Sequence, residues 1–175
     1  TRAARRRPPT EPPVKAVAYL RCLPVTDPDC LVDLELPDPV PGPRDLRVRV
    51  QAVSVNPVDT KVRRGVAPAD GQPRILGFDA AGVVESIGAA VTRFAPGDRV
   101  WYAGSRLRPG TDAELHCVDE RIVGRMPGTL EFAQAAAMPL TAITAWEALF
   151  DRLQLPRDPG GDAGTVLVTA AAGGV

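Results

Sequence analysis

The side chains best suited to bind a metal ion are few in this sequence. It holds one histidine, His116, and three cysteines, Cys22, Cys30 and Cys117, none of them in a CxxC pair. This spacing fits no zinc-ligand set, and neighbouring residues of a strand point to opposite faces, which separates His116 from Cys117. An odd number of cysteines without a secretory leader leads us to expect reduced thiols and a cytoplasmic location.

A second chemical signal lies at the end of the sequence. The β-branched run Thr165–Thr169 leads into Gly173 and Gly174, and a buried strand that runs into glycines is how a dinucleotide-binding βαβ unit begins. The backbone N–H groups of Gly173, Gly174 and Val175 would then face a pyrophosphate at a helix N-terminus. A plain turn also suits two glycines, so both interpretations stay open.

The composition excludes several classes of function. The chain has 175 residues, of which 45% are hydrophobic and 24% charged, as in ordinary globular proteins. Lys and Arg together number 21 and balance 21 Asp and Glu, which argues against a nucleic-acid partner. No apolar run approaches the roughly 18–20 residues of a membrane span. Residues 1–13 hold four Arg and four Pro, which predicts a disordered basic tail.

Most of the remaining chain is patterned as strands. Leu31–Leu36 alternates apolar and acidic residues, which predicts a half-buried antiparallel strand. In Asp45–Val55 the apolar parity changes between Val50 and Val53, which predicts a β-bulge. Pro96-Gly97-Asp98 suits a type II turn. The other predicted strands are Lys15–Leu20, Ala80–Ile87, Arg99–Tyr102, Ala113–Val118 and Ile122–Arg125.

The pattern changes after Pro127. Helical structure is predicted from Ala135 onward, because apolar residues recur at helical spacing on one face; these are Ala142, Ala145, Trp146, Leu149 and Leu153. Thr165–Val168 then has the composition of a buried parallel strand. The sequence therefore predicts a mainly β part followed by the first elements of an α/β part.

Six segments in order resemble motifs of the medium-chain dehydrogenase/reductase superfamily: KAVAYL, SVNPVDTKVR, LGFDAAGVVESIG, FAPGDRVWYAG, VDERIVGRMP and MPLTAITAWEALF. Within it, the chain is most similar to the quinone-oxidoreductase branch, which includes proteins called zinc-type alcohol dehydrogenase-like. The resemblance implies a GroES-like catalytic domain over residues 14–129 and an incomplete NAD(P)-binding Rossmann domain over residues 130–175. It also implies late strands, not contained in this chain, that complete the first domain.

The resemblance also identifies the positions at which zinc-dependent members hold their metal with Cys, His and Cys. Here these positions are Asn56, Phe78 and Leu140. An amide, a benzyl ring and an aliphatic chain cannot replace a thiolate and an imidazole around zinc. Val58 stands where zinc members relay a proton through Ser or Thr, and residues 103–112 contain no cysteine for the structural zinc lobe. We therefore expect no zinc.

Without zinc, hydrogen bonds must polarise the substrate, which favours hydride delivery to a quinone or an α,β-unsaturated carbonyl. Asn56 is the best candidate for a neutral donor to the nicotinamide carboxamide or the substrate oxygen, and an Asx turn into Pro57 is the alternative. Tyr102 could offer its phenol at the cleft or be structural.

The resemblance implies NADPH as the cofactor, a small-molecule substrate, and a homodimer for the whole protein. Thr141 and Thr144 lie in the first turn of the predicted helix, and the resemblance puts Thr144 beside the nicotinamide. A helical Thr also bonds back to the preceding turn, which is the alternative for both residues. Asp59 falls beside the metal site of zinc members and could here pair with a Lys or Arg.

Three functions remain open at this point. The first is a part of a zinc-independent NADPH-dependent oxidoreductase, inactive by itself because most of the cofactor domain is absent from the chain. The second is a stand-alone GroES-like module with a structural or interaction role. The third is a zinc-dependent alcohol dehydrogenase.

Overall fold

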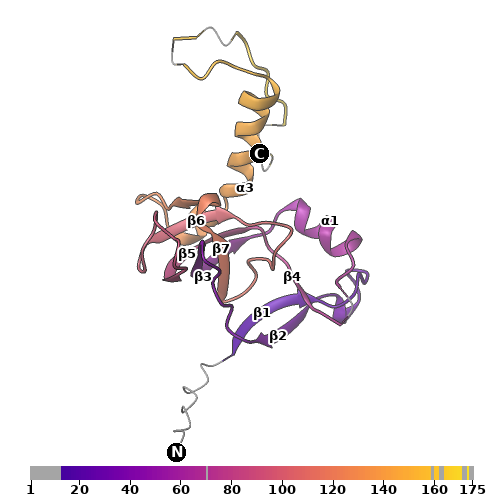
Figure 1. Cartoon of the computed structure of the whole chain (residues 1–175). Helices are drawn as coiled ribbons and strands as arrows, with labels where there is room; N and C mark the ends of the chain where they lie inside the picture. Colours follow the sequence, from indigo (N-terminus) through magenta and orange to yellow (C-terminus); the bar gives the residue numbers. More distant parts are fainter. Residues whose placement is uncertain (1–12, 70, 159, 162–163, 171–172, 174–175) are drawn as a thin grey trace, which may run out of the picture.

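The strands of this protein form two antiparallel sheets in the computed structural model, which describes residues 13–69, 71–158, 160–161, 164–170 and 173. The smaller sheet has the order β2-β1-β4 and the larger one β7-β3-β5-β6-β8 (Figure 1). The smaller sheet contains β1 (Val14–Tyr19), β2 (Val32–Leu36) and β4 (Arg74–Ile75). The larger contains β3 (Asp45–Ser54), β5 (Asp79–Ile87), β6 (Arg99–Ala103), β7 (Leu115–Asp119) and β8 (Val123–Arg125). The mainly β prediction is confirmed.

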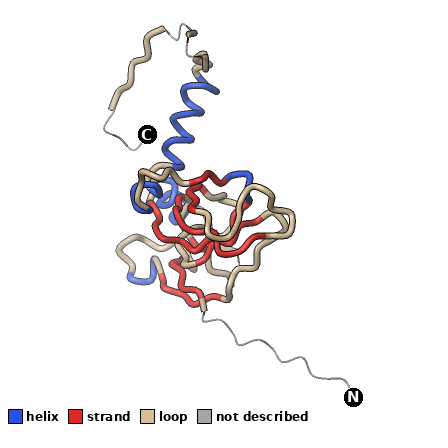
Figure 2. The backbone as a smooth tube through the Cα atoms, turned by 90° about the vertical axis from the view of Figure 1, so that its left-hand side faces the viewer, coloured by secondary structure: helices blue, strands red, loops and turns tan. Residues whose placement is uncertain are grey.

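Short helices connect and flank these sheets. They are α1 (Pro57–Gly65), α2 (Phe132–Ala136) and α3 (Pro139–Trp146), with the 3₁₀ turns η1 (Pro28–Cys30) and η2 (Glu120–Ile122). A π-helical stretch, η3 (Glu147–Arg152), continues α3. Figure 2 shows this helical arm projecting away from the sheets. Within the described residues, no helix is long and apolar enough to cross a membrane.

The main core lies on the larger sheet. Apart from Phe94, which lies in the loop before β6, its residues alternate along the strands and so share one face of the sheet; they are Leu46, Val48, Ala80, Val84, Phe94, Val100, Tyr102, Val118 and Val123. A second apolar cluster joins the sheet to α2 through Ala81, Met126, Ala135 and Ala136. Each fully buried Val or Leu side chain stabilises the fold by roughly 1.5–3 kcal/mol.

Two local predictions are confirmed. In the β3–β5 ladder, Val50 pairs with Gly82 and Ala52 pairs with Ala81, so Gln51 is the extra residue of a bulge. In the turn before β6, Gly97 has a φ of +94°, and the N–H of Asp98 donates to the Ala95 carbonyl at 3.1 Å. This is the left-handed conformation that a type II turn requires at its third residue.

The end of the chain differs from the prediction. Thr165–Val168 forms no strand, and Leu167 is 85% exposed. A parallel strand is stabilised by neighbours that hydrogen-bond to it and by helices that cover it, and the described residues supply neither. The predicted apolar face along α3 and η3 does form. Its residues Trp146 and Leu153 are exposed, because the described residues include no element that packs against this part of it.

Sequence reasoning also missed the helix α1. An Asx turn was the structural alternative at Asn56, but the residue instead begins a helix with Pro57 at its first position. Proline is favoured there because its fixed φ suits the helix and its missing N–H is not needed. The signal was present in Asn56, Pro57 and Asp59, the spacing of an N-cap with an acidic residue three positions later.

Candidate active site around Asp79

Asn56 is held by the helix that it begins. It adopts an extended conformation at the N-cap of α1, and its backbone N–H donates to Asp59 Oδ2 at 2.7 Å. In return, the Asp59 N–H donates to the Asn56 backbone carbonyl at 2.9 Å, and the two residues have the arrangement of a capping box. The residue is only 7% exposed, so these interactions fix its side chain in a largely buried position.

Asp79 connects the starts of three elements, β5, α1 and α3. It is the first residue of β5 and is fully buried. Its Oδ2 accepts a hydrogen bond from Asn56 Nδ2 at 2.9 Å, and its Oδ1 accepts one from the Leu140 N–H, also at 2.9 Å. Its backbone carbonyl accepts the Thr111 hydroxyl at 3.1 Å. The carboxylate therefore ties the start of α1 to the start of α3.

Asp79 belongs to a group of carboxylates without cations. Burial raises the pKa of Asp79 and of Asp59, against the hydrogen bonds that each accepts. Burial, and then the charge of Asp59, raises the pKa of Asp112 to about 6. Within the described part of the chain, none of the three forms an ion pair with Lys or Arg. The expectation that Asp59 pairs with a basic residue is therefore wrong, because backbone N–H groups meet its charge instead.

Gly77 lets this group assemble. It has a φ of +95°, and a Cβ built at this position would lie 2.4 Å from both Asp112 Oδ1 and Thr111 Oγ1. Only glycine combines that conformation with that close approach. Neither Asp79 nor Asp112 was singled out from the sequence. A signal existed for Asp79, since LGFDAAGVV puts one acidic residue directly before the apolar run of residues 80–84.

Tyr102 lies in the core and does not reach this site. Its ring is 2% exposed, and its hydroxyl donates to His116 Nδ1 at 3.0 Å. Because the Pro109 carbonyl can only accept, His116 Nε2 donates to it at 3.1 Å, which leaves Nδ1 as the acceptor. Burial lowers the pKa of His116 to about 4, so the ring is neutral. A catalytic Tyr102 is not supported, because its phenol is enclosed and already paired.

The two predicted threonines lie at the start of the arm. The Thr141 hydroxyl donates to the Met138 carbonyl at 2.9 Å, and the Thr144 hydroxyl donates to the Leu140 carbonyl at 2.8 Å. Both therefore make the local bonds that were the structural alternative, while Thr144 stays exposed. A contact with nicotinamide would use the remaining lone pairs of these oxygens and stays a prediction.

The predicted phosphate loop is described at one residue. Gly173 is exposed, and its N–H donates to the Ala170 carbonyl at 2.8 Å, which is a turn. Gly174 and Val175 lie outside the described residues, as does the predicted tail except Pro13.

The donor set does not fit zinc. At the positions where the resemblance puts metal ligands, the Asn56 amide nitrogen is a hydrogen-bond donor to Asp79, and Phe78 and Leu140 have hydrocarbon side chains. Nowhere in the described ranges do three His, Cys, Asp or Glu side chains gather as a metal-binding group. Zinc prefers four N, S or O ligands in a tetrahedron, so we derive no chemistry from it.

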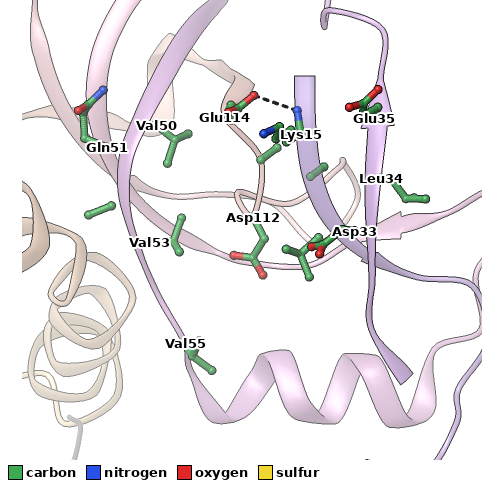
Figure 3. A pocket seen from close by; sticks show the side chains of 14 residues that line it. Lys15, Asp33, Leu34, Glu35, Val50, Gln51, Val53, Val55, Asp112 and Glu114 are labelled. Carbon is green, nitrogen blue, oxygen red and sulfur yellow. Dashed lines mark hydrogen bonds between the residues drawn. The ribbon is translucent and has the colours of Figure 1, made fainter. Parts of the chain in front are cut away.

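A pocket of about 840 Å³ opens beside the site. It lies between β1, β2 and β3, and Figure 3 shows Asp112, Val53 and Val55 along it, with α1 passing below Val55. Neither Asn56 nor Asp79 lines it. The pocket is thus contiguous with the candidate site only through Val55 and Asp112, and its volume alone does not assign it a substrate.

A comparison with protein families matches residues 42–148 to the alcohol dehydrogenase GroES-like domain. The chain is 40% identical over 163 residues to a zinc-type alcohol dehydrogenase-like protein of Staphylococcus epidermidis, covering 93% of this chain and 48% of that protein. It therefore spans about half the length of this relative.

Solved structures agree with this match. One, from Rhizobium etli CFN 42, bears the name of a zinc-dependent alcohol dehydrogenase and is 57% identical, with a TM-score of 0.78 over 84% of this chain and 43% of that one. Another is the Escherichia coli quinone oxidoreductase in complex with NADPH, which is 28% identical, with a TM-score of 0.65 over 77% of this chain and 40% of that one.

Proposed function

The chain belongs to the alcohol dehydrogenase GroES-like domain family, and on this premise we propose that it is the substrate-polarising part of a zinc-independent, NADPH-dependent oxidoreductase. The proposed reaction transfers a hydride to a quinone or an α,β-unsaturated carbonyl. Homologues of the chain are oxidoreductases, including quinone oxidoreductases and alcohol dehydrogenase-like proteins. The finer assignment depends on the residues around Asp79.

One observation carries the proposal. At the first of the metal-ligand positions, the chain has an amide whose nitrogen donates to a buried carboxylate at 2.9 Å. An amide nitrogen has two hydrogens, so one N–H of Asn56 remains for a substrate oxygen. A neutral donor suits an acceptor that spreads incoming negative charge over a conjugated system, whereas an alcohol needs a group that removes its proton.

The cofactor is proposed from a relative and from the exposed start of α3. The E. coli quinone oxidoreductase binds NADPH in its solved complex. When bound, NADPH would supply the hydride. From this chain, Thr141 and Thr144 would accept hydrogen bonds from the nicotinamide carboxamide, since both hydroxyl hydrogens are directed to helix carbonyls. Asn56 would hold the substrate oxygen.

The experiment is a substrate comparison on the full-length protein that contains this chain. We expect quinones or enones to oxidise NADPH at least about tenfold faster than simple alcohols are oxidised with NADP⁺, because the Asn56 amide can donate to a carbonyl oxygen but cannot remove the proton of an alcohol. Faster alcohol turnover would contradict the proposal. Loss of NADPH absorbance reports the reaction directly.

A zinc-dependent alcohol dehydrogenase is the second candidate. The names of the S. epidermidis and R. etli relatives favour it, and the side chains of Asn56, Phe78 and Leu140 oppose it. The two candidates differ in metal content as well as in substrate. Only the second requires tightly bound zinc for turnover.

A further inference from the structure

Resting on the proposed function, we propose that Asp79 is a positioning residue that orients the Asn56 amide so that one N–H is left for the substrate oxygen. The contact between them is a 2.9 Å hydrogen bond between two buried side chains. Asp79 does not touch substrate in this account. It acts through Asn56, and its charge state and acceptor geometry determine what Asn56 can offer.

The orientation of the amide follows from what Asp79 can accept. One hydrogen of Asn56 Nδ2 is donated to Asp79 Oδ2 at 2.9 Å. A carboxylate can only accept, so the nitrogen end of the amide must point towards Asp79. Rotating the amide by half a turn would set its oxygen against the carboxylate, and that contact would be repulsive.

Position 79 requires a group that accepts twice. Its two oxygens receive N–H donors from different elements, Asn56 of the α1 cap and Leu140 of α3. An amide at this position has one acceptor and one donor end, so one of the two N–H groups would always face another N–H. Burying a carboxylate without a cation is costly, and this double acceptance gives a reason for keeping it.

The same carboxylate fixes the distance between the two parts of the site. Leu140 is the second residue of α3, which carries Thr141 and Thr144. Because Asp79 binds both the Leu140 N–H and the Asn56 amide, the proposed substrate donor and the proposed cofactor contacts are held by a single side chain. Its replacement therefore acts on Asn56 and on the start of the arm together.

In the reaction, the remaining N–H stabilises charge and transfers no proton. When bound, NADPH would supply the hydride and become NADP⁺. The hydride would add to the electron-poor carbon of the conjugated acceptor as the π electrons shift to the carbonyl oxygen, and the Asn56 N–H would donate a hydrogen bond to that oxygen. A proton from water would then complete the product. Loss of one such donor typically lowers kcat by about 10²–10³.

The test uses three variants of the full-length protein. D79N keeps the size of the side chain, but its NH2 group must face the N–H donor of either Asn56 or Leu140. We therefore expect lower thermal stability and lower kcat. N56D/D79N restores both bonds of position 79: the carboxylate at position 56 accepts from the amide nitrogen at position 79, and the amide oxygen at position 79 accepts from the Leu140 N–H. D98N, in the turn before β6, is the matched control for an Asp-to-Asn change.

We expect N56D/D79N to regain the stability that D79N loses, while its kcat for enone or quinone stays at least about 100-fold below wild type, because position 56 no longer has a donor. The KM for NADPH should change less than about threefold. Recovery of kcat along with stability would overturn the positioning role, since a purely structural Asp79 predicts that result. Failure of the double variant to regain stability would overturn the hydrogen-bond geometry. If wild-type protein reduced no quinone or enone, the proposed function would fail, and the stability comparison would still test Asp79.

Discussion

Two buried polar groups lie side by side in the larger sheet, and they are built differently. In the β5–β6 ladder, Asp79 pairs with Ala103 and Ala80 pairs with Tyr102, so Asp79 and Tyr102 are one ladder step apart. Tyr102 belongs to a neutral chain in which every donor meets one acceptor, from its hydroxyl to His116 and from His116 to Pro109. Asp79 and Asp59 instead supply carboxylates, whose charge only N–H groups and no cation in the described ranges meet.

This difference indicates that the Tyr102 group contributes to stability and the Asp79 group to catalysis. A satisfied neutral pair stabilises a core and fixes its packing. Buried carboxylates without counter-ions lower stability relative to apolar residues, and their raised pKa values indicate strain between charge and burial. Perturbed carboxylates of this kind concentrate at functional sites. Changes near Tyr102 should therefore affect folding, and changes near Asp79 should affect turnover.

The largest expected effect is at Asn56. We expect Asn56→Ala in the full-length protein to lower kcat for enone or quinone by about 100-fold, because the donor to the developing oxyanion is lost. Loss of the N-cap and of the donor to the buried Asp79 carboxylate should together reduce the free energy of unfolding by about 2–4 kcal/mol. Steady-state kinetics and thermal unfolding measure the two effects. A kcat within about threefold of wild type would show that Asn56, like Tyr102, has only a structural role.

The next change is expected to lower stability without changing turnover. Tyr102→Phe removes the hydroxyl that donates to His116 Nδ1, and leaving that buried acceptor unpaired should reduce the free energy of unfolding by about 1–3 kcal/mol. We expect kcat and KM to stay within about twofold of wild type. If the variant unfolds normally but loses turnover, Tyr102 has the catalytic role that its burial argues against.

The sequence predicted the sheet well because its elements are specified locally. Alternation identified β2, the parity change marked the bulge at Gln51, and Pro96-Gly97 gave the turn. It also identified Asn56 as a candidate. Three features depend on contacts over long separations and had no local signal of their own: the Asn56–Asp79 bond, the Leu140–Asp79 bond, and the pairing of Tyr102 with His116.

The departures from the predicted structure have two physical causes. Thr165–Val168 has strand composition, but a buried parallel strand needs neighbours that the described residues do not include. The apolar face of α3 and η3 was identified correctly and lies exposed for the same reason. Helix α1 was missed because its residues are mostly polar, and because Asn56 was interpreted as a ligand donor or, alternatively, as an Asx turn.

A smaller effect, dependent on pH, tests the electrostatics of the carboxylate group. Burial raises the pKa of Asp112 to about 6 from an ordinary 3.8, so the folded protein holds this proton more tightly than the unfolded chain. This contribution to stability is present at low pH and is lost as the pH rises from about 4 to about 6. Asp112→Asn cannot ionise, so it should match wild type near pH 4.

Near pH 7, Asp112→Asn should be more stable than wild type by roughly 1 kcal/mol, allowing for solvent screening. Urea unfolding at the two pH values measures the difference. Burial lowers the pKa of His116, so this residue makes the folded protein less stable as the pH falls. Because both proteins contain His116, its effect cancels when their stabilities are compared. An equal stability difference at both pH values would show that Asp112 carries no strained charge.

The smallest effect is at the start of the arm. Thr144→Val keeps the shape of the side chain and removes the oxygen that would accept from nicotinamide. We expect the KM for NADPH to rise about three- to tenfold, with kcat nearly unchanged, because one hydrogen bond contributes about 0.5–1.5 kcal/mol. Thr60→Val, on exposed α1 and also bonded to a helix carbonyl, is the matched control and should not change KM.

In the proposed function, hydrogen bonds around Asp79 take the place of the zinc ion of metal-dependent relatives. The most direct measurement is the zinc content of full-length protein that is actively reducing an enone or quinone with NADPH, taken by elemental analysis after dialysis. We expect far less than one zinc per chain and no loss of rate with a chelator, because Asn56, Phe78 and Leu140 offer no ligand set. About one tightly held zinc per chain, with activity that disappears when it is removed, would contradict the account.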